Sequence, residues 1–338
     1  MKLFIQIPCL NEEKTLAAVI RDIPRRIEGV DEVRVLVIDD GSTDRTSQVA
    51  SEEGADYVLK LPYTQGLARA FSAGINRCLE LGADIIVNTD GDHQYSGKDI
   101  PRLVRPILEG KADIVIGDRQ TGRLTHFSSV KRILQKLGSK VVSILSDVRI
   151  PDATSGFRAY SREAALRLNV FSKFTYTLET IIQAGKNQVA VAYVPVHVNG
   201  PTRTSRLFSG IATYLKRSIA TILRIYALYE PLRAFFYIGA IIFLAGLVGV
   251  SRFVFFWFIE QGQGHVQSLI ISAVLLIIGF QVWMLGILAD LISVNRRLGE
   301  EILYRMKKNA TSTENERPAV SGEAMNGPLP SKKARKAG

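Results

Sequence analysis

The chain has 338 residues, a net charge of +11 and 47% hydrophobic residues. This length predicts one medium-sized domain with an appendage. The two cysteines, Cys9 and Cys78, exclude a disulfide framework and a cysteine-based zinc site, and they fit a reducing cytoplasm. We also expect no amino-terminal signal peptide, because the chain starts directly with the pattern of a strand.

Residues 1–120 alternate apolar runs with amphipathic stretches. Strand patterns lie at residues 3–7, 33–38, 56–60, 84–89 and 112–117, and helical patterns lie between them at 12–27, 43–53, 66–81 and 98–109. This alternation predicts an α/β fold with a doubly wound, mostly parallel sheet. A helical pattern at 130–146 and a strand pattern at 189–197 extend the domain, which we expect to span residues 1–200.

Polar residues follow the first strand pattern, where the next helix is expected to begin. The segment from Pro8 to Glu13 reads PCLNEE. It lacks the GxGxxG fingerprint of dinucleotide-binding enzymes, which disfavours a hydride-transfer enzyme. A Walker A pattern is absent as well.

The second strand pattern ends in an acidic turn that reads DDGSTD from Asp39 to Asp44. Ser42 or Thr43 could cap the following helix, but a cap alone does not explain two successive aspartates. Ligands bind at the carboxyl ends of strands in open α/β sheets. A carboxylate placed there could accept a hydrogen bond from a nucleotide base.

The fourth strand pattern is followed by DGDHQ, from Asp90 to Gln94. Two carboxylates one residue apart can converge on one hard cation, and the Gln94 amide oxygen offers a third ligand. Mg²⁺ and Mn²⁺ prefer such oxygen ligands and keep positions open for substrate phosphates. An ordinary acidic turn is the alternative for an isolated DGD run, and the neighbouring motifs favour the metal site.

The order of these motifs resembles a known family. PxxNE, DDGSTD and DGDxQ are followed by TSGFR at residues 154–158, and together they resemble glycosyltransferase family 2. Within it they are most similar to polyprenyl-phosphate (dolichol-phosphate) hexosyltransferases. The resemblance covers roughly residues 1–210 and implies a GT-A-like domain that uses Mg²⁺ or Mn²⁺.

The resemblance also implies roles for individual residues. The metal ligands would be Asp90, Asp92 and Gln94, with Asp92 the main catalytic candidate. The nucleotide-sugar donor, linked to UDP or GDP, would be held by Pro8, Asn11, Glu12, Asp40 and Asp90.

Several arginines match family positions near the phosphates. Arg119 follows the strand pattern at 112–117 and is a candidate for catalysis and phosphate binding, since guanidinium forks suit phosphate oxygens. A solvated surface role is the alternative for any single arginine. The acceptor phosphate would be bound by Arg119, Arg132, Ser155 and Arg158.

The acceptor half favours a phosphate nucleophile. Family members that glycosylate hydroxyls use a carboxylate base, often in a Glu-Asp pair. In this chain Glu179 is the nearest candidate for such a base. A lipid phosphate is ionised near neutral pH and needs no base. We therefore expect inverting transfer of a hexose to polyprenyl phosphate. The alternatives are transfer to a hydroxyl of a lipid-linked saccharide or glycolipid, and a non-catalytic membrane scaffold.

Apolar segments dominate the chain after residue 200. Residues 206–228 place apolar side chains on one helical face and arginines on the other, which predicts an interfacial amphipathic helix within 201–232. A helix packed on the domain core is the alternative. Two apolar runs at 234–258, interrupted by Arg252, and at 266–289 can each cross a hydrocarbon core of about 30 Å, which predicts two transmembrane helices within 233–292.

Charge around these runs predicts their orientation. Basic residues flank both runs, and the connector at 259–265 contains none, so both termini and the catalytic domain are expected on the cytoplasmic side of the inner membrane. The same distribution favours an anionic membrane over nucleic acid as the partner. Arg252 would snorkel to the outer interface or contact another subunit of a homo-oligomer. Residues 293–338 would form a basic cytoplasmic tail, largely disordered from Asn309 onward.

Overall fold

In the computed structural model, the described residues are 1–120, 143, 151–170, 176–199, 230–259 and 266–315. A seven-stranded sheet forms the centre of the amino-terminal domain, in the order β3-β2-β1-β4-β6-β5-β7. Its strands are β1 (Lys2–Cys9), β2 (Glu32–Asp39), β3 (Tyr57–Lys60), β4 (Ile85–Asn88), β5 (Ile114–Asp118), β6 (Arg158–Ser161) and β7 (Val191–Pro195).

The predicted mostly parallel sheet is confirmed, with one antiparallel strand that the sequence patterns do not predict. β6 lies between β4 and β5 and pairs antiparallel with both, whereas β1 pairs parallel with β2 and β4. β6 has only four residues, too few for a clear apolar period. In its pairing with β4, Arg158 lies opposite Asn88, and this register brings the TSGFR segment to the end of β4.

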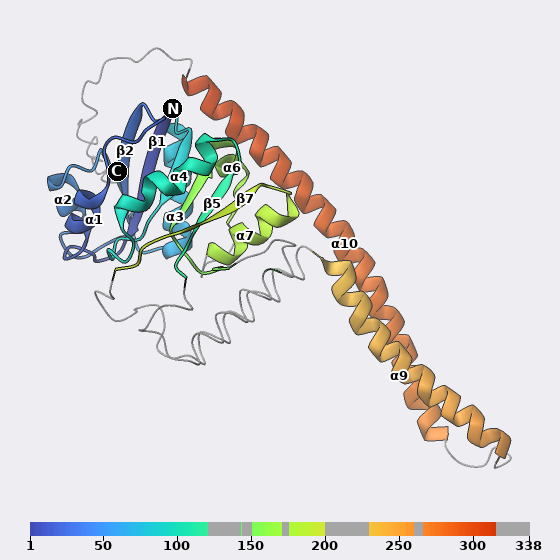
Figure 1. Cartoon of the computed structure of the whole chain (residues 1–338). Coiled ribbons are helices and arrows are strands. Elements are labelled where there is room, and N and C mark those ends of the chain that lie inside the picture. The colour runs from blue at the N-terminus through green and yellow to red at the C-terminus, as the bar shows by residue number, and fades with distance from the viewer. Residues whose placement is uncertain (121–142, 144–150, 171–175, 200–229, 260–265, 316–338) are drawn as a thin grey trace, which may run out of the picture.

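Helices cover both faces of the sheet (Figure 1). One apolar cluster joins alternate residues of β1, including Leu3 and Ile5, to α1 (Leu16–Asp22) and α4 (Ile100–Leu108), which follows the short 3-10 helix η1 (Gly97–Asp99). The opposite cluster joins Phe4 to the second set of helices. That set comprises α3 (Leu67–Glu80), α6 (Arg162–Arg167) and α7 (Thr177–Lys186). Burial on both faces explains why the central strands read as continuous apolar runs.

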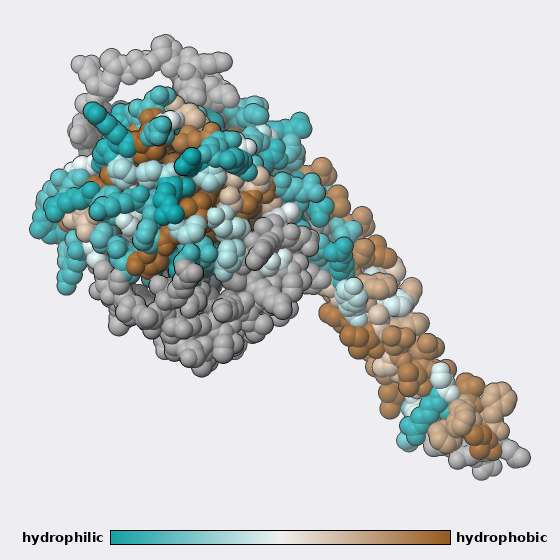
Figure 2. Space-filling model, viewed as in Figure 1, coloured by the Kyte–Doolittle hydropathy of each residue, from teal (hydrophilic) through white to brown (hydrophobic). Residues whose placement is uncertain are grey.

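The carboxyl-terminal helices form an antiparallel hairpin that projects from the domain (Figure 1). α9 (Pro231–Ile259) and α10 (Val266–Asn315) are each long and apolar enough to cross a membrane, and their apolar side chains face outward in Figure 2. Glycines allow the close packing. A Cβ on Gly239 would lie 2.5 Å from Trp283 Cδ1, and one on Gly279 would lie 2.8 Å from the Phe243 Cβ.

α10 continues beyond the position where the sequence predicts the end of regular structure. It remains helical to Asn315 and runs alongside the amino-terminal domain (Figure 1), whereas a disordered tail was expected from Asn309. Ion pairs one turn apart, such as Glu301 with Arg305 at 2.9 Å, support this extension. Most of the predicted amphipathic helix, at 200–229, and the last residues, 316–338, lie outside the described part of the chain.

Candidate active site

The three predicted donor motifs meet at one edge of the sheet. β1 lies between β2 and β4, and all three strands run parallel. Their carboxyl ends therefore place the segments that start at Pro8, Asp39 and Asp90 side by side. The sheet order brings these motifs, although about 30 and 50 residues apart, to the edge where open α/β sheets bind their ligands.

Hydrogen bonds join the first two motifs. Asn11 has a positive φ of 55°; its backbone N–H donates to Ser42 Oγ at 2.9 Å, and its side-chain oxygen accepts the Thr43 N–H at 2.8 Å. The Glu12 N–H donates to Thr46 Oγ1 at 2.9 Å. The prediction that Ser42 or Thr43 caps the next helix is wrong. α2 (Thr46–Glu52) begins later and has no side-chain cap, because these polar groups bind the neighbouring loop instead.

Asp40 is buried and holds the loop in front of α3. Its two carboxylate oxygens accept the backbone N–H groups of Gln65 at 2.7 Å and Gly66 at 2.8 Å. Gly66 has a φ of 95°, a conformation that favours glycine. A carboxylate has about four acceptor positions, so these two bonds orient Asp40 while it keeps the capacity to accept a base N–H.

Two glycines permit close packing around the DGD turn. A Cβ on Gly156 would lie 2.9 and 3.1 Å from the carboxylate oxygens of Asp90, and a Cβ on Gly91 would lie 2.8 Å from Cys9 Sγ and 3.3 Å from Glu12 Cγ. The TSGFR loop and the amino-terminal motif therefore press on the DGD turn from two directions. A side chain at Gly156 would displace the Asp90 carboxylate, and one at Gly91 would displace Cys9 or Glu12.

The electrostatics of this turn suit a cation. Burial, the charge of Asp92 and the charge of Glu12 raise the pKa of Asp90 to about 7, against the opposing effect of Arg119. The Gln94 N–H donates to Asp92 Oδ1 at 3.1 Å, a bond that joins two of the three predicted metal ligands. Among the described residues, no group of three or more His, Cys, Asp or Glu side chains is arranged for a metal. The predicted ligands, Asp90, Asp92 and Gln94, are two carboxylates and an amide, a donor set that suits Mg²⁺ or Mn²⁺ completed by substrate oxygens.

Arg119 is held by an aspartate that the sequence reasoning missed. Its Nε and Nη2 donate to the two oxygens of Asp152 at 2.7 and 2.9 Å, and Nη2 also donates to Thr154 Oγ1 at 2.6 Å. The Arg119 side chain is 10% exposed and the Asp152 side chain is fully buried. Burial alone would raise the pKa of Asp152, but the adjacent guanidinium lowers it. An acid two residues before TSGFR was the available signal.

The prediction that Arg158 binds the acceptor phosphate is wrong in this structure. The side chain is fully buried and donates to the backbone oxygens of Ser155 at 2.8 Å, Thr177 at 2.9 Å and Ala153 at 3.1 Å. It therefore ties the TSGFR loop to α7. Its inward direction follows from its position on β6, opposite Asn88.

The remaining acceptor candidates have different outcomes. Ser155 is fully buried, close to the Tyr95 hydroxyl, so in this structure it contributes to the packing of the loop. Arg132 lies outside the described residues. Asn88 was not predicted; its side-chain nitrogen donates to the Gly156 oxygen at 2.8 Å and to the Tyr176 hydroxyl at 2.9 Å, which fixes the loop beneath Asp90.

Two family models match the chain. The Glycosyl transferase family 2 model matches residues 4–168, and the GtrB C-terminal hairpin model matches residues 230–294. The first range contains every donor motif described above. The second covers α9 and the first part of α10.

Known proteins agree with this assignment. A polyprenol monophosphomannose synthase of Mycolicibacterium smegmatis is 30% identical, over 56% of this chain and 74% of that protein. A dolichyl-phosphate hexose transferase of Haloferax volcanii is 30% identical, over 55% and 78%. The crystal structure of glucosyl-3-phosphoglycerate synthase from Mycobacterium tuberculosis with Mn²⁺, UDP-glucose and phosphoglyceric acid has a TM-score of 0.54 and 26% identity, covering 67% of this chain and 80% of that one. The chain belongs to glycosyl transferase family 2 and is a nucleotide-sugar-dependent hexosyltransferase.

Proposed function

We propose that this enzyme transfers a hexose from a UDP- or GDP-linked sugar to polyprenyl phosphate at the cytoplasmic face of the inner membrane. One observation carries the proposal: a DGD turn, packed on the TSGFR loop beside a fixed arginine, belongs to a chain with an apolar helical hairpin. A donor site and a membrane anchor in one chain suit an acceptor that is insoluble in water. Two relatives, named polyprenol monophosphomannose synthase and dolichyl-phosphate hexose transferase, support a polyprenyl-phosphate acceptor.

In the proposed reaction, an oxygen of the lipid phosphate attacks the anomeric carbon of the donor sugar. The bond from that carbon to the diphosphate breaks, and the nucleoside diphosphate leaves with the bonding electrons. The attack comes from the face opposite the leaving group, so this single displacement inverts the configuration. Mg²⁺ or Mn²⁺ held by Asp90, Asp92 and Gln94 would neutralise charge on the diphosphate. Asp40, Asn11 and Glu12, with Pro8 shaping the pocket, would hold the nucleoside.

The acceptor side needs positive charge rather than a base. A phosphate monoester with a second pKa of about 6 is already ionised near neutral pH. Arg119, oriented by Asp152, would place its positive charge between the donor diphosphate and the lipid phosphate. Glu179, the candidate base for a hydroxyl acceptor, is 2% exposed, which does not favour that alternative.

The proposed topology has both termini in the cytoplasm and residues 259–265 outside. The basic residues that flank α9 and α10 support it, by the positive-inside rule. With this orientation the catalytic domain meets cytoplasmic nucleotide sugars. The two apolar runs bring the domain to the lipid.

The test uses the full chain in lipid nanodiscs with radiolabelled UDP- and GDP-sugars. Polyprenyl phosphate and the matching polyprenol are offered as paired acceptors, with Asp92→Asn as the inactive control. We expect label in an acid-labile polyprenyl-phosphate product, dependent on Mg²⁺ or Mn²⁺. Transfer to polyprenol alone would replace this proposal with the hydroxyl-acceptor alternative, and nucleotide-sugar binding without transfer to any lipid would favour the scaffold.

A further inference from the structure

The part of α10 beyond the hairpin is docked on the catalytic domain. Tyr304 is 8% exposed, and its hydroxyl donates to Glu163 Oε2 on α6 at 3.1 Å. The Arg167 guanidinium carbon lies 4.2 Å from the centre of the Tyr304 ring. A buried aromatic ring with a hydrogen bond and a cation–π contact is a specific attachment rather than incidental proximity.

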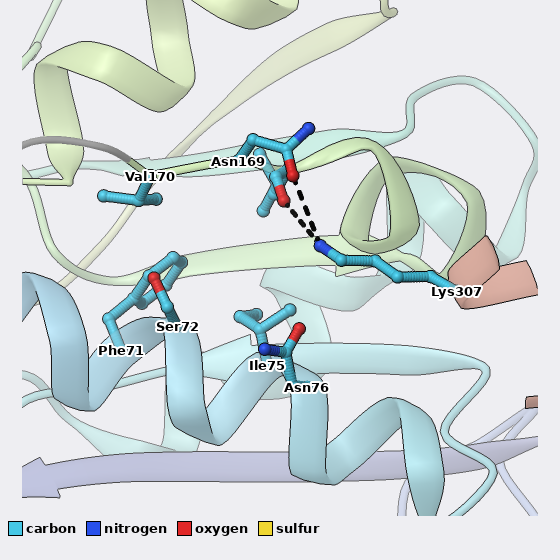
Figure 3. Close-up of a pocket in the computed structure, with 8 residues that line it drawn as sticks. Phe71, Ser72, Ile75, Asn76, Asn169, Val170 and Lys307 are labelled. Atoms are coloured by element: carbon cyan, nitrogen blue, oxygen red, sulfur yellow. Dashed lines mark hydrogen bonds between the residues drawn. The ribbon is translucent and has the colours of Figure 1, made fainter. Parts of the chain in front are cut away.

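Lys307 extends the same contact toward α3. Figure 3 shows its amine reaching the loop after α6, where it donates to the Leu168 backbone oxygen at 3.1 Å and lies 3.4 Å from Asn169 Oδ1. Burial lowers the pKa of Lys307. The amine borders a cavity of about 160 Å³ whose other wall is α3, including Phe71 and Ile75.

A second attachment lies at the start of α9. Lys186, at the end of α7, pairs with Glu230, directly before α9, at 2.6 Å, and their side chains are only 15% and 20% exposed. Arg233 pairs with Glu230 at 3.1 Å. The start of α9 is therefore fastened to the catalytic domain as well.

The two attachments are well separated along α10. The start of α9 packs beside Gly286, where an added Cβ would lie 2.9 Å from Phe235 Cβ. Tyr304 lies 18 residues beyond Gly286, which corresponds to about 27 Å of helix. Two contacts this far apart on one helical unit define both the height and the tilt of a rigid domain.

The last part of α10, residues 295–315, lies outside both regions that the family models match. The hairpin model ends at residue 294 and the domain model ends at residue 168, so residues 295–315 are a feature of this chain beyond both. α10 contains no proline from Val266 to Asn315, which favours an unbroken helix. In Figure 1, β1 starts at the end of the domain where α10 terminates and runs toward the end nearer the hairpin. The DGD edge of the sheet thus faces the membrane side.

We propose that residues 290–308 of α10 form a strut that holds the nucleotide-sugar site at a set height and tilt above the bilayer, with Tyr304 as its positioning residue. The inference rests on the proposed lipid acceptor. The strut contributes no group to the reaction. It increases the frequency with which a membrane-embedded phosphate meets the donor, because a misplacement of about 1 Å can lower a rate by about 100-fold.

The test separates positioning from chemistry by using two acceptors. Tyr304→Ala removes the docked ring, and Met306→Ala, on the same helix and 63% exposed, is the matched control. Gly299→Pro interrupts the strut without touching the dock, and Gly299→Ala is its control because an added Cβ there meets no atom within 4 Å. Each variant is assayed in nanodiscs with long-chain polyprenyl phosphate, and with a short, water-soluble prenyl phosphate in detergent.

We expect Tyr304→Ala and Gly299→Pro to lower transfer to the long-chain acceptor by about tenfold or more. Transfer to the short acceptor and nucleotide-sugar affinity should stay within about twofold, and both controls should resemble the wild type. Equal losses with both acceptors, or no loss with either, would overturn the strut. Retained nucleotide-sugar affinity shows that a variant is folded.

A distance measurement keeps the strut and the proposed function distinguishable. Energy transfer from a dye on the catalytic domain to dyes in the nanodisc lipid reports domain height without any reaction. We expect a broader or shifted distance distribution for Tyr304→Ala and Gly299→Pro than for their controls. If wild-type protein fails to use polyprenyl phosphate, the proposed function fails, and the distance result alone decides whether the strut exists. Unchanged distances refute it.

Discussion

Replacing Asp152 with asparagine tests the buried arginine fork most directly. The wild-type carboxylate accepts two charge-assisted bonds from Arg119 at 2.7 and 2.9 Å, with both side chains almost entirely buried. Removing one partner of such a pair leaves a buried, uncompensated charge, at a cost of about 3–5 kcal/mol. Asparagine keeps one acceptor oxygen, so we expect about 2–4 kcal/mol for Asp152→Asn.

That loss corresponds to a fall in Tm of about 5–15 °C, at about 2–4 °C per kcal/mol for a domain of this size. Thermal unfolding of the full chain and the kcat/KM for polyprenyl phosphate are measured together. We expect kcat/KM to fall by more than nucleotide-sugar affinity, because Arg119 loses its orientation toward the phosphates. Asp118→Asn is the control. Asp118 ends β5, directly before Arg119, and its carboxylate accepts the Gln120 N–H, which an asparagine side-chain oxygen can also accept. A stability change below about 0.5 kcal/mol with full transfer activity would refute this account of the fork.

The remaining predictions concern the metal turn and the membrane topology. Asp92→Ala should nearly abolish transfer, and so should excess EDTA on the wild type; full turnover in EDTA would contradict the metal site. Gly156→Ala should weaken Mn²⁺-dependent activity at least tenfold, about the scale of a small ligand displacement, because its Cβ would lie 2.9 Å from Asp90 Oδ2; Gly299→Ala, in open space, is the control, and equal Mn²⁺ titrations would reject the close contact. Since the pKa of Asp90 is raised to about 7, metal-free protein should lose stability as pH rises from about 4 through 7, and Asp90→Asn should flatten this slope in unfolding experiments with EDTA. A cysteine at Gly262 should react with an impermeant reagent from outside intact cells, and reaction only after permeabilisation would reverse the proposed topology.

Local sequence determined the order of elements and the place of the donor site. Apolar runs such as residues 33–38 and 84–89 predict strands buried on both faces, and the observed strands β2 and β4 lie within one residue of them. The motifs after these runs meet because parallel strands end at the same edge of a sheet. Two apolar runs likewise predict α9 and α10, since length and composition are enough to recognise a spanning helix.

Tertiary structure alone decided which partner each polar side chain has. Arg119 and Arg158 look alike in sequence, as arginines near the end of a strand or motif. One lies at the site on a fork with Asp152, 33 residues away, whereas the other points into the core because β6 pairs antiparallel with β4. Side-chain direction depends on strand pairing, which local periodicity does not encode when a strand has four residues.

The docking of α10 has the same origin. The charged residues after residue 289 are typical of a solvated tail. Opposite charges one helical turn apart, such as Glu301 and Arg305, indicate a helix but no partner for it. The burial of Tyr304 depends on Glu163 and Arg167, about 140 residues earlier in the chain. Such a contact depends on the fit between two surfaces that are distant in the sequence, and local periodicity identifies neither partner.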